Sequence, residues 1–124
     1  GALVEFSGMV RADDLAGEPV EALRLVAYSP MTERAMEALV DQAKLRWQLN
    51  EVCLVHRVGV IPLGGCVVYI AVQSAHRSEA FAACQFLIDR LKHDVPLWKQ
   101  VQTCGHAQWV EQKASDVAKH HRWD

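Results

Sequence analysis

The sequence predicts an α+β fold in which two main helices cover one face of a mostly antiparallel sheet, as a two-layer sandwich. Segments rich in β-branched residues occur in pairs along the chain, which is typical of strands. Two longer segments carry apolar residues at three- and four-residue steps, the period of an amphipathic helix. The predicted order is β-β-α-β-β-α-β-β. A chain of 124 residues is the size of one domain, so we expect a single domain over residues 1–124.

The N-terminal segments predict two strands. Gly1 to Arg11 alternates apolar and polar residues, with an expected bend at Gly8, and Val20 to Tyr28 alternates in a similar way. Ala12 to Pro19 between them contains acids, a glycine and a proline, which indicates a loop longer than a hairpin turn.

A helix follows the second strand. Ser29 is the expected N-cap and Pro30 the first helical residue, and the apolar pattern ends near Trp47. Glu51 to Val60 then reads as one buried strand, and Ile61 to Gly65 reads as a turn.

The C-terminal half predicts a strand, a long helix and short strands. Cys66 to Gln73 is β-branched, and the helix runs from about Arg77 to Lys92 or His93. Short strands are expected at Trp98 to Cys104 and Ala107 to Glu111, with a turn at Gly105. The predicted core stripe of the helix is Ala80, Phe81, Cys84, Leu87, Ile88 and Leu91.

Composition excludes several classes of protein. Thirteen Lys and Arg residues against fifteen Asp and Glu give a net charge of −2, so no general attraction to nucleic acid or to a membrane surface is expected. No apolar run reaches the roughly 20 residues of a membrane helix. Any anion site must therefore come from a local cluster of cations.

The cysteines and histidines lack the spacing of a metal site. The cysteines form no C-x-x-C pair, and we expect them to be reduced, buried or inert, which indicates the cytoplasm. His56 lies in an apolar strand and is interpreted as a structural histidine. The cysteines and the other histidines that lack metal-site spacing are Cys53, Cys66, Cys84, Cys104, His93, His106, His120 and His121.

Cations gather at the two ends of the long helix. His76 and Arg77 lie where a strand meets the helix start, a place that favours anions, although they can also be plain surface residues. Lys92 and Lys99 flank the other end, where partial burial would assist proton transfer or acyl capture, although lysines are common there for dipole reasons alone. Trp98 could form a wall for a flat ring or pack in the core.

Short motifs follow one another in order along the chain. They are Gly1 to Arg11, Tyr28 to Met31, His56 to Gly59, Ser74 to Arg77, Leu91 to Lys92, Pro96 to Lys99, and Trp109 to Glu111. Together they resemble the large, catalytic subunit of molybdopterin synthase, and the likeness covers essentially the whole chain.

The resemblance implies an α/β-hammerhead-like fold with short extra strands and the activity of a sulfurtransferase. The family converts cyclic pyranopterin monophosphate to molybdopterin by forming its dithiolene. Sulfur comes from the C-terminal thiocarboxylate of a small ubiquitin-like partner that ends in Gly-Gly. The resemblance also implies a homodimer of this chain within a heterotetramer, with no metal or other cofactor.

The resemblance assigns roles to seven residues. Lys92 is implied as the key catalytic lysine and Lys99 as the second. The chemistry agrees, because arginines and a helix start suit a phosphate and lysines suit a thiocarboxylate. The residues implied in substrate binding are Phe6, Arg11, His76, Arg77 and Lys113.

The length of the helix separates these residues into two groups. From Arg77 to Lys92 there are 15 steps of ~1.5 Å, so the two backbones are roughly 22 Å apart. We therefore predict that His76 and Arg77 serve a site whose Lys92 and Lys99 come from the other subunit of a dimer.

The sequence departs from the family pattern at five positions where that family usually carries a different, charged residue. We expect these departures to alter fine substrate affinity or partner contacts while leaving the two catalytic lysines in place. The positions are Met9, Gln100, Val101, Gln108 and Lys113.

A second hypothesis is a non-catalytic α+β binding or regulatory module, including an inactive relative. The element order permits it, but such a module has no need of Lys92 and Lys99 together with His76 and Arg77. A metal-binding or nucleic-acid-binding protein is a more distant alternative.

Overall fold

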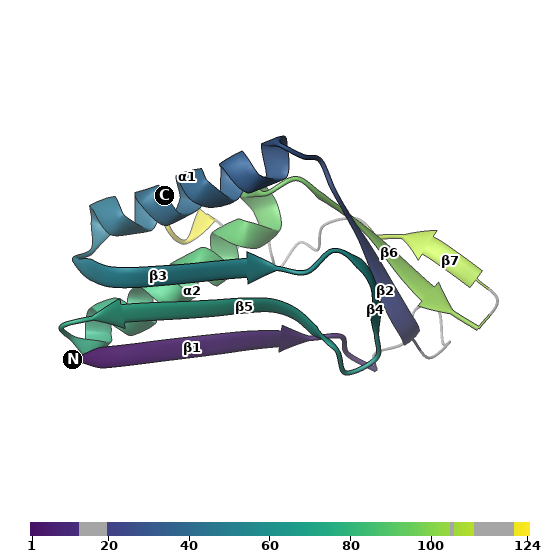
Figure 1. Ribbon diagram of the computed structural model, residues 1–124, viewed down its shortest axis with the longest axis horizontal. Helices are drawn as coiled ribbons and strands as arrows, with labels where there is room; N and C mark the ends of the chain where they lie inside the picture. Colours follow the sequence, from purple (N-terminus) through teal and green to yellow (C-terminus); the bar gives the residue numbers. More distant parts are fainter. Residues whose placement is uncertain (13–19, 105, 111–120) are drawn as a thin grey trace.

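The computed structural model describes residues 1–12, 20–104, 106–110 and 121–124, and these contain seven strands and two helices (Figure 1). The predicted loop at 12–19, apart from Ala12, and the predicted turn at Gly105 lie outside the described residues. The elements are β1 (Ala2–Met9), β2 (Val20–Ala27), α1 (Met31–Arg46), β3 (Leu49–His56), β4 (Gly59–Pro62), β5 (Cys66–Ser74), α2 (Arg77–Asp94), β6 (Leu97–Thr103) and β7 (His106–Trp109).

Three antiparallel strands in the order β1-β5-β3 form the first sheet, and both helices cover the same face of it (Figure 1). Alternate residues of β1 turn toward the helices, as the sequence pattern predicts. The main core lies between sheet and helices, and Leu39, Ile70, Phe86 and Leu87 are almost completely buried in it. The predicted bend at Gly8 is confirmed, because the pairing of β1 with β5 shifts register between Gly8 and Met9.

A second antiparallel sheet has the order β4-β2-β6-β7 and a smaller core of its own. Leu23, Leu25, Ile61 and Val101 are buried there. The predicted α+β class with a mostly antiparallel arrangement of strands is therefore confirmed, although the strands divide between two sheets.

The prediction of one strand from Glu51 to Val60 is wrong. The chain forms β3 in the first sheet, breaks, and then forms β4 in the second sheet, so the element order gains a strand. Gly59 at the break has a φ of 88°, which a residue with a side chain rarely adopts. The predicted turn at Ile61 to Gly65 is shorter, because Ile61 and Pro62 belong to β4.

The start of α1 also differs from the prediction. Pro30 takes the N-cap position and no side chain caps the helix, so the Ser29 hydroxyl does not act as predicted. It donates instead to the Glu33 carboxylate, at 2.5 Å. The Tyr28 N–H donates to the Thr32 hydroxyl, and the Thr32 N–H donates to the Tyr28 carbonyl, both at 2.8 Å. This reciprocal pair fixes the entry into the helix.

The buried face of α2 is broader than the predicted stripe. Phe81 is 62% exposed, whereas Ala83 and Phe86 are fully buried. The reason is that α2 packs against α1 as well as against the sheet, which moves its buried face away from Phe81.

The cysteines differ from the prediction in burial. All four are free thiols, but only Cys84 is buried, and burial raises its pKa. Cys53, Cys66 and Cys104 are exposed, because their positions face outward although their neighbours are apolar.

Neither α1 nor α2 has the length and hydropathy of a membrane-crossing helix.

Two phenylalanines on α2 provide a test of this packing. We expect Phe86→Ala to lower the free energy of unfolding by about 3–5 kcal/mol, because it leaves a cavity in the main core. The matched change Phe81→Ala should cost less than about 1 kcal/mol. Urea unfolding of both variants measures the difference, and equal losses would contradict this assignment of the buried face.

Candidate functional site

His76 and Arg77 lie at the N-terminal end of α2, and both are exposed. His76 is the N-cap residue, but its side chain makes no capping hydrogen bond. Ser74 supports the junction, because its hydroxyl donates to the Gln48 carbonyl at 2.9 Å and lies 3.4 Å from the His76 N–H. The junction therefore holds an imidazole and a guanidinium next to the unpaired N–H groups of a helix start.

Lys92 lies on the last turn of α2, and Lys99 lies on β6 after a short connection through Val95 and Pro96. Both lysines are exposed. Because α2 is one continuous helix of 18 residues, Arg77 and Lys92 are separated along its axis by roughly 22 Å. One chain therefore keeps the two cationic groups apart.

Arg11 lies with the lysines and apart from His76 and Arg77. β1 runs antiparallel to β5, so Ala2 pairs with Ser74 near the start of α2, and Met9 pairs with Cys66 at the far end of the sheet. β1 ends on the side of the first sheet where α2 finishes and the second sheet begins (Figure 1), and Arg11 follows β1 by two residues. The resemblance implies one pocket for all three cations and does not divide them in this way.

The second core connects Arg11 and Lys99. Val10 precedes Arg11 and is buried in this core together with Val101. Val110 packs against the same cluster, and its N–H donates to the Lys99 carbonyl at 2.9 Å. The backbones that carry both cations are therefore fixed to one small apolar cluster.

The two remaining predicted substrate residues are placed differently. Phe6 lies in the middle of β1, opposite Ile70, and is half-buried against the main core. Lys113 lies outside the described residues.

Trp98 lies on the opposite face of the second sheet from Lys99, as alternation along β6 requires. Lys99 pairs with the buried Leu25, whereas Trp98 is half exposed and makes edge contacts with Tyr28 and Trp109, with both centroid distances 6.0 Å. Trp98 is therefore not a core residue, as one alternative predicted. Its role as a wall for a flat ring stays a prediction. No local sequence pattern predicts this aromatic cluster, because its members come from three separate segments.

Two departures from the family pattern have a structural explanation. Val101 is buried in the second core, opposite Leu23, where a carboxylate would lose its hydration. Gln100 pairs with Trp109 and lies on the face that carries Trp98. Gln100 therefore faces away from Lys99, whereas Val101 lies on the same face of β6 as Lys99.

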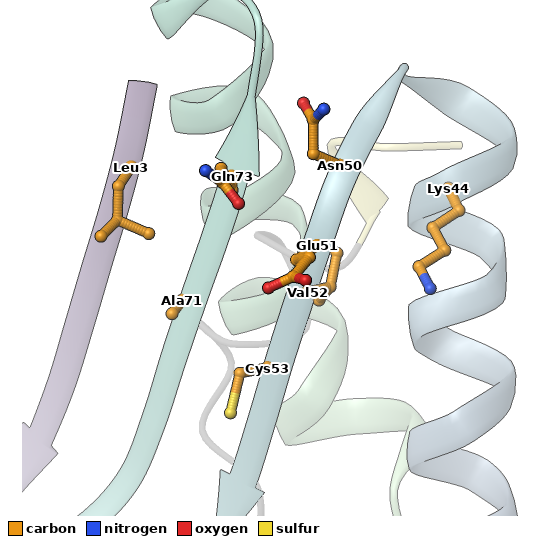
Figure 2. A pocket seen from close by; sticks show the side chains of 8 residues that line it. All are labelled: Leu3, Lys44, Asn50, Glu51, Val52, Cys53, Ala71 and Gln73. Carbon is orange, nitrogen blue, oxygen red and sulfur yellow. The ribbon is translucent and has the colours of Figure 1, made fainter. Parts of the chain in front are cut away.

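A shallow hollow of about 260 Å³ lies on the first sheet (Figure 2). None of the predicted site residues lines it. The hollow contains one cationic side chain, a lysine of α1, and no cluster of cations. We therefore do not assign it to the reaction. Its lining residues are Leu3, Lys44, Asn50, Glu51, Val52, Cys53, Ala71 and Gln73.

Within the described part of the chain, no three His, Cys, Asp or Glu side chains are placed to hold a metal ion. His56 is half-buried in β3, with its Nδ1 2.9 Å from the Arg57 carbonyl, which agrees with a structural histidine. Burial lowers the pKa of the His56 imidazole, and the hydrogen bond to the Arg57 carbonyl partly opposes this effect.

Comparison with known proteins gives consistent matches. Residues 1–94 match the model of the MoaE protein family. The molybdopterin synthase catalytic subunit of Escherichia coli strain K12 is 45% identical over 123 residues, covering 99% of this chain and 81% of that protein.

Solved structures agree with the sequence comparison. A molybdopterin synthase structure from Staphylococcus aureus matches with a TM-score of 0.86 and 34% identity, covering 90% of this chain and 81% of that one. A complex of subunits 1 and 2 of molybdopterin-converting factor from Helicobacter pylori matches with a TM-score of 0.76, covering 91% and 73%. At 20% identity, the latter supports the fold alone.

One buried hydroxyl, that of Thr32, holds the short segment that joins Lys92 on α2 to Lys99 on β6. Thr32 Oγ1 donates to the Pro96 carbonyl at 2.7 Å and accepts from the Tyr28 N–H. We expect Thr32→Val, which keeps the shape, to lower the free energy of unfolding by about 1–3 kcal/mol because both partners lose their hydrogen bond. Thr32→Ser should recover most of that loss in thermal unfolding. A Val variant as stable as the Ser variant would contradict the role of the hydroxyl.

Proposed function

We infer that this chain, which belongs to the MoaE protein family, is the catalytic subunit of a molybdopterin synthase, a sulfurtransferase of molybdenum cofactor biosynthesis. The observation that carries this conclusion is the match over 99% of the chain to a molybdopterin synthase catalytic subunit. The alternative of a non-catalytic binding module is not favoured.

The substrate is cyclic pyranopterin monophosphate, and sulfur comes from the thiocarboxylated Gly-Gly end of a small ubiquitin-like partner. Both reactants are anions, so each binds best next to positive charge, which the exposed cations of this chain supply. Arg11, His76 and Arg77 suit the phosphate, because a guanidinium can bind two of its oxygens at once.

Lys92 and Lys99 serve the sulfur transfer itself. An ammonium group next to the thiocarboxylate attracts the tail and stabilises negative charge that develops as its carbonyl is attacked. A deprotonated lysine could instead act as base or as a transient acyl acceptor. The connection held by Thr32 keeps the backbones of the two lysines in a fixed relation, which either role requires.

Two subunits build each site. Within one chain, Lys92 and Arg11 lie at one end of α2 and Arg77 lies at the other, so a small pterin cannot contact both ends. In a symmetric dimer the second copy can bring its own His76 and Arg77 to the lysine end of the first. The full assembly is then a heterotetramer, with a small subunit at each of two sites.

A cytoplasmic location belongs to the same proposal. All four cysteines are free and three of them are exposed, which suits a reducing compartment.

Replacement of Lys92 tests the assignment of the reaction. We expect Lys92→Ala to reduce dithiolene formation by about 10²–10³-fold, because a group that stabilises charge in the transition state is lost. The assay mixes the protein with thiocarboxylated partner and cyclic pterin and measures the dithiolene product.

The control for that assay is Lys44→Ala, which removes an exposed lysine of α1 that is not assigned to the site. This variant should work at nearly the normal rate. Normal turnover by Lys92→Ala would overturn the mechanism, and no product from the unaltered protein would overturn the function.

A further inference from the structure

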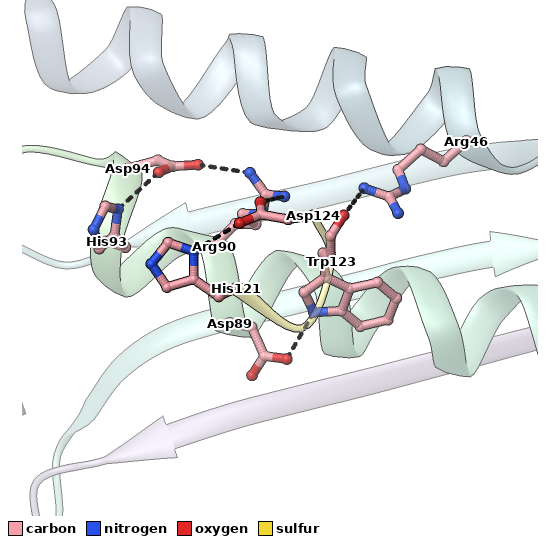
Figure 3. A network of polar contacts seen from close by, with 8 residues as sticks. All are labelled: Arg46, Asp89, Arg90, His93, Asp94, His121, Trp123 and Asp124. Atoms are coloured by element: carbon pink, nitrogen blue, oxygen red, sulfur yellow. Dashed lines mark hydrogen bonds and ion pairs between the residues drawn. The ribbon is translucent and has the colours of Figure 1, made fainter. Parts of the chain in front are cut away.

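Asp89 is a buried carboxylate that the proposed reaction does not use. It lies on α2 and is only 2% exposed. Gln85 Nε2 donates to one oxygen at 2.9 Å. Trp123 Nε1 donates to the other at 2.9 Å (Figure 3). Arg122 lies 3.5 Å from that second oxygen. A buried charge with three donors fixes the groups that surround it.

The last residues of the chain are bound to both helices at this point. The Trp123 ring packs edge-to-face on Phe86 and Trp47, with centroid distances of 5.5 and 5.7 Å. Arg46, the last residue of α1, donates to the Trp123 carbonyl at 3.0 Å and lies over the same rings. These contacts fix Trp123 against both helices.

A second set of contacts fixes the next turn of α2. Arg90 lies 3.2 Å from a carboxylate oxygen of Asp124 and 3.8 Å from one of Asp94 (Figure 3). The Arg90 guanidinium also lies over the Phe86 ring. The C-terminal residues thus hold the helix between Asp89 and Asp94.

Lys92 belongs to that same stretch of helix. It follows Asp89 by three residues, so the two lie one turn apart on neighbouring parts of the helix surface. We propose that Asp89 and Trp123 are positioning residues for Lys92, because their hydrogen bond fixes the last turns of α2. This inference rests on the proposed function, since it assigns the two residues to the reaction through the lysine.

The test compares two tryptophans of one aromatic cluster. Trp123→Phe keeps a ring but removes the N–H that reaches Asp89, whereas Trp47→Phe makes the same change in a ring with no described contact to that carboxylate. At a temperature where both variants are folded, we expect amide exchange at residues 90–94 to be about tenfold faster in Trp123→Phe than in Trp47→Phe.

Kinetics with the complete enzyme separate positioning from plain destabilisation. Trp123→Phe should lower kcat about tenfold and change KM for the pterin less than about twofold, because the lysine is displaced while the phosphate cations are not. Trp47→Phe should keep the unaltered kcat. Asp89→Asn, which keeps the shape but removes the charge, should also lower kcat and serves if Trp123→Phe does not fold.

Equal exchange and equal kcat in the two tryptophan variants would overturn the proposal. If the unaltered protein forms no dithiolene, the proposed function fails. The exchange measurement would still decide whether Trp123 fixes the end of α2.

Discussion

The fixed rise of an α-helix is the constraint on which the proposed site depends. Backbone hydrogen bonds hold α2 as one element from Arg77 to Asp94, and packing against β5, β1 and α1 keeps it in place. A helix of this length cannot bend its two ends toward one small molecule. Its cationic ends must therefore serve different sites, or one site that receives its groups from two chains.

The remaining elements place cations at these two ends. β5 leads directly into the helix, so the strand fixes His76 and Arg77 above the edge where β1 begins. At the other end, the hydrogen bond from Thr32 to Pro96 holds the crossing to the second sheet, which carries Lys99. The main core and the second core thus each fix part of the lysine end, and neither core alone would define it.

Local patterns in the sequence predicted most of the fold. Both helices and the strand pairs around them follow from hydrophobic periodicity, and the ends of α2 follow from the strand before it and Pro96 after it. The break between β3 and β4 was missed, because a buried strand and two strands in different sheets share one apolar pattern. Phe81 was placed in the core, since periodicity gives a face but not the second helix that shifts it.

The same limit applies to the site. The sequence predicts the lysines and the His76–Arg77 pair as site residues through its resemblance to the family, and the helix rise predicts their separation. It could not place Arg11 on the lysine side, because that depends on how β1 pairs with β5. Trp123 lies among polar residues in the sequence, and only the fold brings its ring N–H to the buried carboxylate of Asp89.

The most direct test of a site shared by two chains is complementation between two inactive variants. Lys92→Ala and Arg77→Ala are expressed together, supplied with thiocarboxylated partner, and assayed for dithiolene. In a shared site, each mixed dimer regains one intact site of two. Random pairing then makes half of the dimers mixed and restores about a quarter of the normal activity. Activity no higher than that of the two variants assayed separately would show that each chain builds its own site.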